Sequence, residues 1–154
     1  DVTVLGVKRD PSTAPDAVDA VYGPDDRYEV LGRADYVVVA CPLTDETRGM
    51  FDADAFESMD SDAVLVNVAR GAIVDEPALV AALQTGNLGG AALDVTVDEP
   101  PEHGSPLWDL DNVVLTPHMA GGSPRFPERG AELFADNYER FVAGDHDAMR
   151  NRVV

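Results

Sequence analysis

Runs of apolar residues, each ended by a polar turn or a proline, recur along the chain. The run at 36–41 is continuously apolar and stops at Pro42, and similar runs follow further along. Unbroken runs of this kind are typical of strands in a parallel sheet that is covered on both faces. We therefore expect strands at 2–7, 36–41, 63–68, 90–95 and 112–116, with a minor strand at 20–22.

Helix signals separate these runs. Asp75-Glu76-Pro77 places acidic residues and a proline in a first helical turn, 78–83 is apolar, and Gly86 suits a left-handed helix end. Weaker signals predict helices at 24–32, from Asp52 or Asp54 to Met59, and at 127–141. Strands that alternate with helices indicate an α/β protein with a Rossmann-like, doubly wound parallel sheet.

Polar residues fall where the predicted strands end. In an open parallel sheet, ligands bind outside the carboxyl ends of the strands. The residues at those ends should therefore meet in one crevice: Cys41, Pro42, Ala69, Arg70, Asp94, Thr116, Pro117 and His118.

Four side chains near these ends suit hydride and proton transfer. Arg70 precedes a glycine that allows a sharp turn, and its planar guanidinium suits a carboxylate. His118 can exchange a proton with a carbonyl oxygen, and Glu99 would favour the imidazolium by bonding to the far ring nitrogen. Asp94 ends an apolar strand, where a carboxylate needs a partner. Each also has a structural interpretation: a helix-capping arginine, a structural histidine, a solvated glutamate and a capping aspartate.

The chain is strongly acidic but has the composition of a globular protein. Its 154 residues include 11 basic and 29 acidic ones, a net charge of −18, with 45% hydrophobic and 26% charged residues. Such a surface repels itself at low salt, so we expect a protein of a salt-loving organism; an acidic protein of an ordinary cell is the alternative. The charge disfavours nucleic acid as a partner, because phosphate contacts need clustered Lys and Arg.

Three further features argue against a disulfide-bonded, a membrane-spanning and a metal-binding protein. Cys41 is the single cysteine, so no internal disulfide framework exists, and a reducing compartment is expected. No apolar run approaches the roughly 20 residues of a spanning helix, and the chain opens without a signal pattern, so we expect a cytoplasmic protein without membrane association. His103, His118 and His146 lack any ligand spacing, and we expect no metal site.

Five longer segments surround the strand-end residues. They are 41–49 (CPLTDETRG), 65–71 (LVNVARG) with 74–76 and 78–79, 91–95 (AALDV) with Glu99-Pro100, 106–108 (PLW), and 112–121 (NVVLTPHMAG). Together they resemble the D-isomer-specific 2-hydroxyacid dehydrogenase family, in its order and spacing and over nearly the whole chain. Five long segments are far more specific than a single glycine pattern.

The resemblance implies roles for particular residues. Arg70 matches the arginine that binds the substrate carboxylate and C2 carbonyl, His118 the acid/base, and Glu99 its partner. Asp94 matches the residue that holds the nicotinamide carboxamide. The implied activity is reduction of a 2-keto acid to the D-2-hydroxy acid with hydride from NAD(P)H; glyoxylate, hydroxypyruvate and phosphoglycerate chemistry all remain open. Also implied along the cofactor, mostly through backbone groups, are Cys41, Pro42, Thr47, Val68 and Ala69, together with Arg70, His118 and Gly121.

The end of the first strand bears on the cofactor. NAD-preferring folds place an acid at the end of the second strand of the fold, whereas a basic residue there accommodates a 2′-phosphate. Lys8 and Arg9 stand at this point, and Lys8 is the single lysine. We expect NADP(H) to be preferred and NAD(H) to remain possible; in the alternative, Asp10 binds the ribose.

The resemblance begins at the strand that carries Val4. The preceding strand, its Gly-x-Gly-x-x-Gly loop and the substrate domain are not in this sequence, which matches the carboxy-terminal half of the family. We expect a nucleotide-binding domain at 1–125, incomplete at its amino-terminal side, and a crossing helix with a tail at 126–154. This segment alone should bind cofactor poorly, because the glycine loop and its helix contact the pyrophosphate.

Family resemblance also suggests a homodimer built largely on the cofactor domain. An alternative function is a dinucleotide-sensing binding module without catalysis, as in some relatives. Joint retention of Arg70, Glu99 and His118 favours the enzyme.

Overall fold

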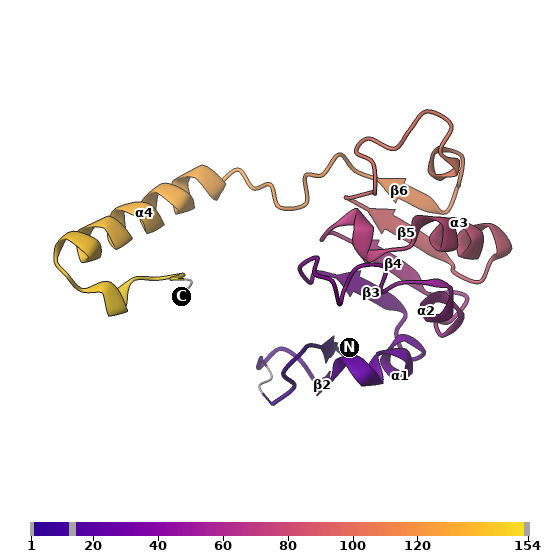
Figure 1. Cartoon of the computed structure of the whole chain (residues 1–154), viewed down its shortest axis with the longest axis horizontal. Coiled ribbons are helices and arrows are strands. Elements are labelled where there is room, and N and C mark those ends of the chain that lie inside the picture. Colours follow the sequence, from indigo (N-terminus) through magenta and orange to yellow (C-terminus); the bar gives the residue numbers. More distant parts are fainter. Residues whose placement is uncertain (1, 13–14, 153–154) are drawn as a thin grey trace. The chain divides into compact units, whose positions relative to one another are not determined.

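The chain forms two compact units, residues 1–120 and 121–154. The computed structural model describes residues 2–12 and 15–152. All strands of the described residues lie in the first unit, and the second contains the long helix α4 (Phe126–Val142) followed by the short helix η4 (His146–Ala148) (Figure 1). The predicted helix at 127–141 is confirmed to within one residue at each end.

The strands form two parallel sheets. All pairs are parallel, as predicted for an α/β protein, but the first two described strands pair only with each other. The two-stranded sheet contains β1 (Leu5–Val7) and β2 (Ala20–Tyr22). The four-stranded sheet has the order β3 (Tyr36–Val39), β4 (Val64–Asn67), β5 (Gly90–Leu93) and β6 (Val113–Leu115).

The helices of the first unit begin and end at the signals in the sequence. The Asp52 side chain accepts a hydrogen bond from Ala55 N at 3.0 Å, so Asp52 rather than Asp54 caps α2. Asp75 caps α3 in the same way, and Gly86 ends α3 in the left-handed conformation with φ 76°. The helices are η1 (Pro24–Asp26), α1 (Arg27–Leu31), α2 (Ala53–Glu57), η2 (Gly71–Ile73), α3 (Glu76–Thr85) and η3 (Pro106–Trp108).

The two faces of the four-stranded sheet differ in burial. On one face Val39, Leu65 and Leu93 join a core that includes Phe56 of α2 and Leu79 of α3. Figure 1 shows α2 and α3 together along one side of the strands. The first unit is therefore organised around one well-covered sheet face.

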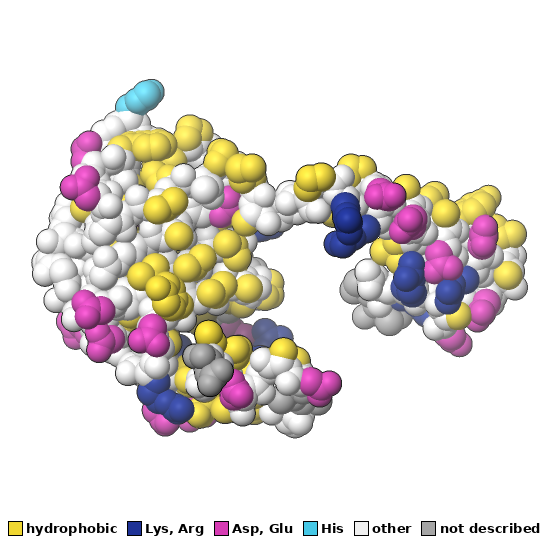
Figure 2. Space-filling view, turned by 180° about the vertical axis from the view of Figure 1, so that it is seen from behind, with side chains coloured by type: hydrophobic (Ala, Val, Ile, Leu, Met, Phe, Trp, Pro, Cys, Tyr) yellow, Lys and Arg dark blue, Asp and Glu magenta, His cyan; other side chains and the backbone are white. Residues whose placement is uncertain are grey.

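The opposite face is apolar and uncovered among the described residues. Tyr36, Val38 and Val114 are 72%, 61% and 61% exposed, and hydrophobic side chains gather on the first unit in Figure 2. The expectation that the run at 36–41 is covered on both faces is wrong for β3 in this structure. An apolar run indicates that a strand has side chains suited to burial on both faces. It does not identify the helices that would cover each face.

Helix α4 has no buried residue in the second unit. Phe134 and Tyr138 stack with ring centroids 6.3 Å apart, and both are exposed. Arg140 pairs with Asp136 at 3.1 Å, one helical turn away. Among the described residues, no helix is both long and apolar enough to cross a membrane.

Candidate active site

The register of the sheet aligns the polar residues at its carboxyl edge. Asn67 of β4 lies opposite Leu93 of β5, which lies opposite Leu115 of β6. The next residue after each of these partners therefore leaves the sheet at the same edge. For β5 and β6 these residues are Asp94 and Thr116, and their side chains are joined by a 2.6 Å hydrogen bond.

His118 and Glu99 form the pair that was predicted. His118 Nδ1 lies 2.7 Å from Glu99 Oε2, and both side chains are partly exposed. The carboxylate accepts the hydrogen bond, so Nδ1 carries the proton and Nε2 is the ring nitrogen left to face a ligand. Two residues from separate strand connections thus form one imidazole–carboxylate pair, an arrangement that can exchange a proton with a ligand.

Asp94 anchors the segment that carries His118. Its carboxylate accepts from Thr116 Oγ1 and from the amides of Met119 and Ala120, the latter two at 2.8 Å. The Thr116 hydroxyl is the main cause of a lowered pKa of the Asp94 carboxyl; the two amides and the nearby His118 act in the same direction, against the effect of burial. Asp94 is 6% exposed, and these three hydrogen-bond donors favour its ionised form in spite of burial.

Arg70 lies beyond β4, on a turn shaped by a buried amide. Asn67 is 1% exposed; it accepts from Ala69 N at 3.0 Å and donates to the Arg70 carbonyl at 3.1 Å. The Arg70 guanidinium donates to the Ala69 carbonyl and is otherwise exposed. Among the described residues, it makes no hydrogen bond or ion pair with His118 or Asp94.

The connection that carries Glu99 packs against the Arg70 turn. A Cβ at Gly71 would lie 2.0 Å from the backbone oxygen of Thr96, so this approach requires glycine. Glu76, the first residue of α3, accepts from Val97 N at 3.2 Å. These contacts hold the connections after β4 and β5 beside each other.

The candidate cofactor residues after β3 lie in a tight loop. Thr47 Oγ1 donates to the Pro42 carbonyl at 2.7 Å and accepts from Thr44 N at 2.8 Å. The Thr47 side chain therefore stabilises the loop, and its contact with a cofactor stays a prediction. Cys41 is half-buried, and burial raises the pKa of its thiol. This state suits a packing residue rather than a nucleophile.

The other cofactor candidates differ in exposure. After β4, Val68 is 39% exposed whereas Ala69 is 7% exposed. Gly121 is exposed and is the first residue of the second unit. Their contacts with a cofactor stay predictions.

The basic residues after β1 lie on an exposed loop. Arg9 pairs with Glu46 at 2.9 Å, and the two side chains are 77% and 75% exposed. The Lys8 amide donates to the Tyr22 carbonyl of β2. Asp10 accepts from Ser12 N at 3.0 Å, and the bonds from Ser12 lower the pKa of its carboxyl. One oxygen of the Asp10 carboxylate is thus occupied by a hydrogen bond within its own turn.

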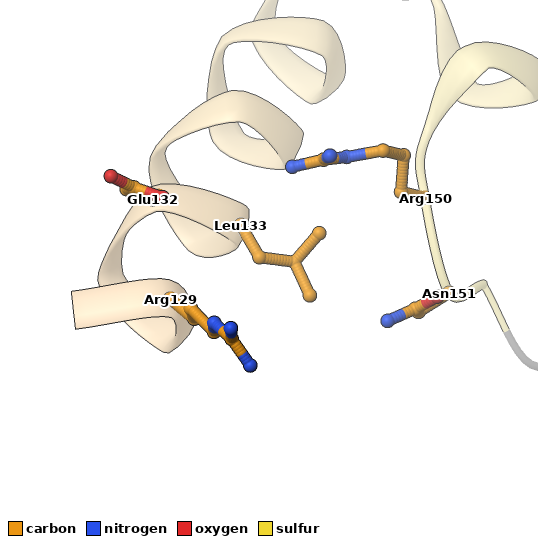
Figure 3. Close-up of a pocket in the computed structure, with 5 residues that line it drawn as sticks. All are labelled: Arg129, Glu132, Leu133, Arg150 and Asn151. Atoms are coloured by element: carbon orange, nitrogen blue, oxygen red, sulfur yellow. The ribbon is translucent and has the colours of Figure 1, made fainter. Parts of the chain in front are cut away.

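A pocket in the second unit is unrelated to these residues. Figure 3 shows Arg129 and Leu133 of α4 extending toward the side on which Arg150 and Asn151 lie, whereas Glu132, which also lines the pocket, points away from them. Arg150 Nε is already paired with Asp136 at 3.1 Å. The pocket contains none of the residues predicted for catalysis or cofactor binding.

Asn67 and Thr116 are site residues for which no role was predicted. Both are polar residues at the end of an apolar strand, and Asn67 is buried, where a polar group must find a partner. That signal was available in the sequence, but the partners lie on other connections. Together with the acid/base pair, these residues complete the carboxyl edge of a Rossmann-like nucleotide-binding fold.

Comparison with known proteins agrees with this class. Residues 1–120 match the family model described as D-isomer specific 2-hydroxyacid dehydrogenase, NAD binding domain. The glycerate dehydrogenase of Methylorubrum extorquens is 42% identical over 117 residues, which are 75% of this chain and 37% of the relative. The glyoxylate reductase of Pyrococcus furiosus is 44% identical over 117 residues, or 76% and 34% of the two chains.

Solved structures give the same assignment. A D-isomer specific 2-hydroxyacid dehydrogenase from Xanthobacter autotrophicus, in complex with NADPH and MES, is 38% identical with a TM-score of 0.81, covering 98% of this chain and 60% of that one. A family member from Aeromonas salmonicida is 38% identical with a TM-score of 0.85, covering 99% and 47%. The chain belongs to the D-isomer-specific 2-hydroxyacid dehydrogenase family, and it spans less than half the length of the curated relatives it matches.

Proposed function

We propose that the full protein reduces a 2-keto acid to the D-2-hydroxy acid, using NAD(P)H. The observation that carries this proposal is the 2.7 Å pair of His118 Nδ1 with Glu99 Oε2, beside a carboxylate-anchored loop in a nucleotide-binding fold. The named relatives, a glycerate dehydrogenase and glyoxylate reductases, support the same reaction class.

The chain's own residues handle the proton and the substrate charge. His118 Nε2 donates a proton to the carbonyl oxygen, and Glu99 stabilises the imidazolium before transfer. The Arg70 guanidinium binds the substrate carboxylate and polarises the carbonyl. In the reverse direction, His118 removes the proton of the hydroxyl group.

A nicotinamide cofactor supplies the hydride when it is bound. Asp94 Oδ2 accepts one hydrogen bond, from Ala120 N, and a carboxylate oxygen has room for a second donor such as a carboxamide N–H. Exposed Val68 offers an apolar contact at the same edge. The donor and acceptor set therefore fits the group. Residues 41–42, 47 and 69 would contact the cofactor mainly through their backbone.

NADP(H) is the preferred cofactor in this proposal. Lys8 and Arg9 follow β1, where a basic residue suits a 2′-phosphate. Asp10, the residue that could bind a free ribose, accepts a hydrogen bond within its own turn. A relative crystallised with NADPH supports the same choice.

The discriminating test is NADPH consumption by the full protein with a panel of 2-keto acids. The panel should include glyoxylate, hydroxypyruvate and phenylpyruvate, and the product should be assigned by chiral chromatography. D-hydroxy acid formation is the expected result. A folded protein that binds NADPH but turns over none of them is instead the dinucleotide-sensing module.

We further propose that the full protein is a cytoplasmic homodimer adapted to high salt. The net charge of −18 supports screening by counterions, and the free thiol of Cys41 suits a reducing compartment. The dimer rests on family resemblance. A melting temperature that does not rise between dilute buffer and molar KCl contradicts the salt adaptation, and a monomeric mass by light scattering contradicts the dimer.

A further inference from the structure

The backbone of His118 is in a conformation that non-glycine residues rarely adopt. Its φ is 49°, in the left-handed region. Such a conformation persists only when surrounding contacts determine it. Its own amide donates to the carbonyls of Asp94 and Thr116, both at 3.0 Å. Further contacts must fix the direction of the chain on either side of this residue.

The Asp94 side chain makes those contacts on both sides of His118. Before it, Thr116 Oγ1 donates to Oδ1 at 2.6 Å. After it, Met119 N donates to Oδ1 and Ala120 N to Oδ2, each at 2.8 Å. A single carboxylate therefore brackets the left-handed residue with three hydrogen bonds.

Thr116 differs from the other two donors because its bond depends on its side chain. The amides of Met119 and Ala120 are present whatever residue occupies those positions. The Thr116 hydroxyl can be removed by substitution, and its bond is charge-assisted because Asp94 is ionised. This hydroxyl also occupies one lone pair of Oδ1 and so orients the carboxylate plane.

We propose that Thr116 is a positioning residue, which acts through Asp94 to hold the left-handed backbone of His118 and so aims its imidazole at Glu99. The proposal rests on the proposed function, in which His118 transfers the proton. In this role Thr116 acts through its bond to Asp94 and not by contact with a reacting atom. Its hydroxyl keeps the acid/base pair assembled before a substrate arrives, and small misplacements of such groups cost rate.

The test compares Thr116→Val with Thr116→Ser in the full protein. Valine keeps the shape and removes the hydroxyl, whereas serine keeps the hydroxyl and removes the methyl group. Thr116 is exposed, so neither change opens a core cavity. Thr85→Val is a matched control, because it removes a hydroxyl that donates to the Ala81 carbonyl within α3, away from the sheet edge.

The expected result is a fall in kcat of about 10- to 100-fold in Thr116→Val, with the NADPH dissociation constant within about threefold of wild type. Thr116→Ser should stay within about threefold of wild type, and Thr85→Val should be unchanged. Equal activity of the valine and serine variants overturns the proposal. An equal loss of cofactor affinity in Thr116→Val also overturns it, because Thr116 then acts on the cofactor.

An NMR measurement separates this proposal from the proposed function. The Nδ1 proton of His118 in its bond to Glu99 should give a downfield signal, assigned by its absence in His118→Gln. We expect the signal to be lost or shifted in Thr116→Val and kept in Thr116→Ser, even if no 2-keto acid is turned over. An unchanged signal in Thr116→Val contradicts the positioning role.

Discussion

The carboxyl ends of β5 and β6 differ from those of β1 and β4 in how their functional side chains are bonded. After β5 and β6, Thr116 bonds to the Asp94 carboxylate at 2.6 Å and His118 to Glu99 at 2.7 Å, and the His118 amide joins the two pairs through the Asp94 carbonyl at 3.0 Å. After β1 and β4, Arg9 and Arg70 are exposed, and their described bonds go to the exposed Glu46 and to a neighbouring carbonyl. The groups proposed to transfer the proton are joined by short hydrogen bonds, whereas the side chains of Arg9 and Arg70 are exposed.

The difference agrees with the roles proposed for these residues. Proton transfer needs an imidazole at a fixed position and orientation, so preassembly lowers its cost. A cation that binds a ligand anion must exchange its partner, and an exposed ion pair contributes at most about 1 kcal/mol. If Arg9 and Arg70 bind ligand anions as proposed, their weak present bonds cost little free energy to replace.

The largest predicted effect concerns His118, one of the hydrogen-bonded residues after β5 and β6. His118→Gln keeps a polar side chain but cannot donate a proton to the carbonyl. We expect kcat to fall by about 100- to 10,000-fold, while the NADPH dissociation constant stays within about threefold. Turnover kinetics and fluorescence titration measure the two quantities. Equal losses of kcat and cofactor affinity contradict a role in proton transfer.

The next effect tests the cation after β4. Arg70→Lys keeps the charge but removes the planar fork that binds a carboxylate through two hydrogen bonds. We expect kcat/KM for the 2-keto acid to fall by about 10- to 100-fold, which corresponds to one lost charge-assisted bond. The Nδ1 signal of His118 should not change, because Arg70 is not bonded to it. A changed signal would show that Arg70 influences the His118–Glu99 pair, and it would contradict the separation between the residues after β4 and those after β5 and β6.

A smaller effect tests the cation after β1. In the proposed cofactor site, Arg9→Ala removes one contact to the 2′-phosphate, so NADPH should bind about tenfold more weakly. NADH lacks that phosphate and should bind within twofold of wild type. Glu46→Gln is the matched control, because it breaks the same exposed pair and keeps Arg9. Equal losses for NADPH and NADH rule out recognition of the phosphate by Arg9.

The smallest effect concerns pH and the Asp94 anchor. Because folding lowers the pKa of Asp94, its ionised form stabilises the native state. That contribution is complete above the ordinary value of 3.8 and disappears as the pH falls through the lower native value. The difference in free energy of unfolding between wild type and Asp94→Asn should therefore shrink on going from pH 7 to acid. Denaturant titrations at each pH measure it; a constant difference contradicts the linkage.

Local signals in the sequence predicted the elements well. Asp75, Pro77 and Gly86 set the limits of α3 through caps that act within a few residues. Parallel strands share one carboxyl edge, and this rule alone predicted that Asp94 and His118 lie close together. The hydrogen bond from the His118 amide to the Asp94 carbonyl confirms it. These predictions needed no knowledge of which distant residues touch.

The features that sequence did not predict depend on tertiary partners. An apolar run such as 36–41 does not show that Tyr36 and Val38 face an uncovered side. Nor do the predicted strands at 2–7 and 20–22 show by themselves that β1 and β2 pair in a separate sheet. The hydrogen bond from Thr116 to Asp94 joins two separate connections, so no local pattern specifies it. The family resemblance supplied roles for Arg70, Glu99 and His118, but not the residues that orient them.

A crystal structure of the full protein with NADPH and oxamate, a 2-keto acid analogue, tests the comparison most directly. We predict that the Asp94, Thr116 and Glu99 bonds persist, with His118 Nδ1 still about 2.7 Å from Glu99 Oε2. Arg70 should leave the Ala69 carbonyl and bind the oxamate carboxylate through both terminal nitrogens. An oxamate bound away from Arg70, or a His118 ring separated from Glu99, contradicts the account.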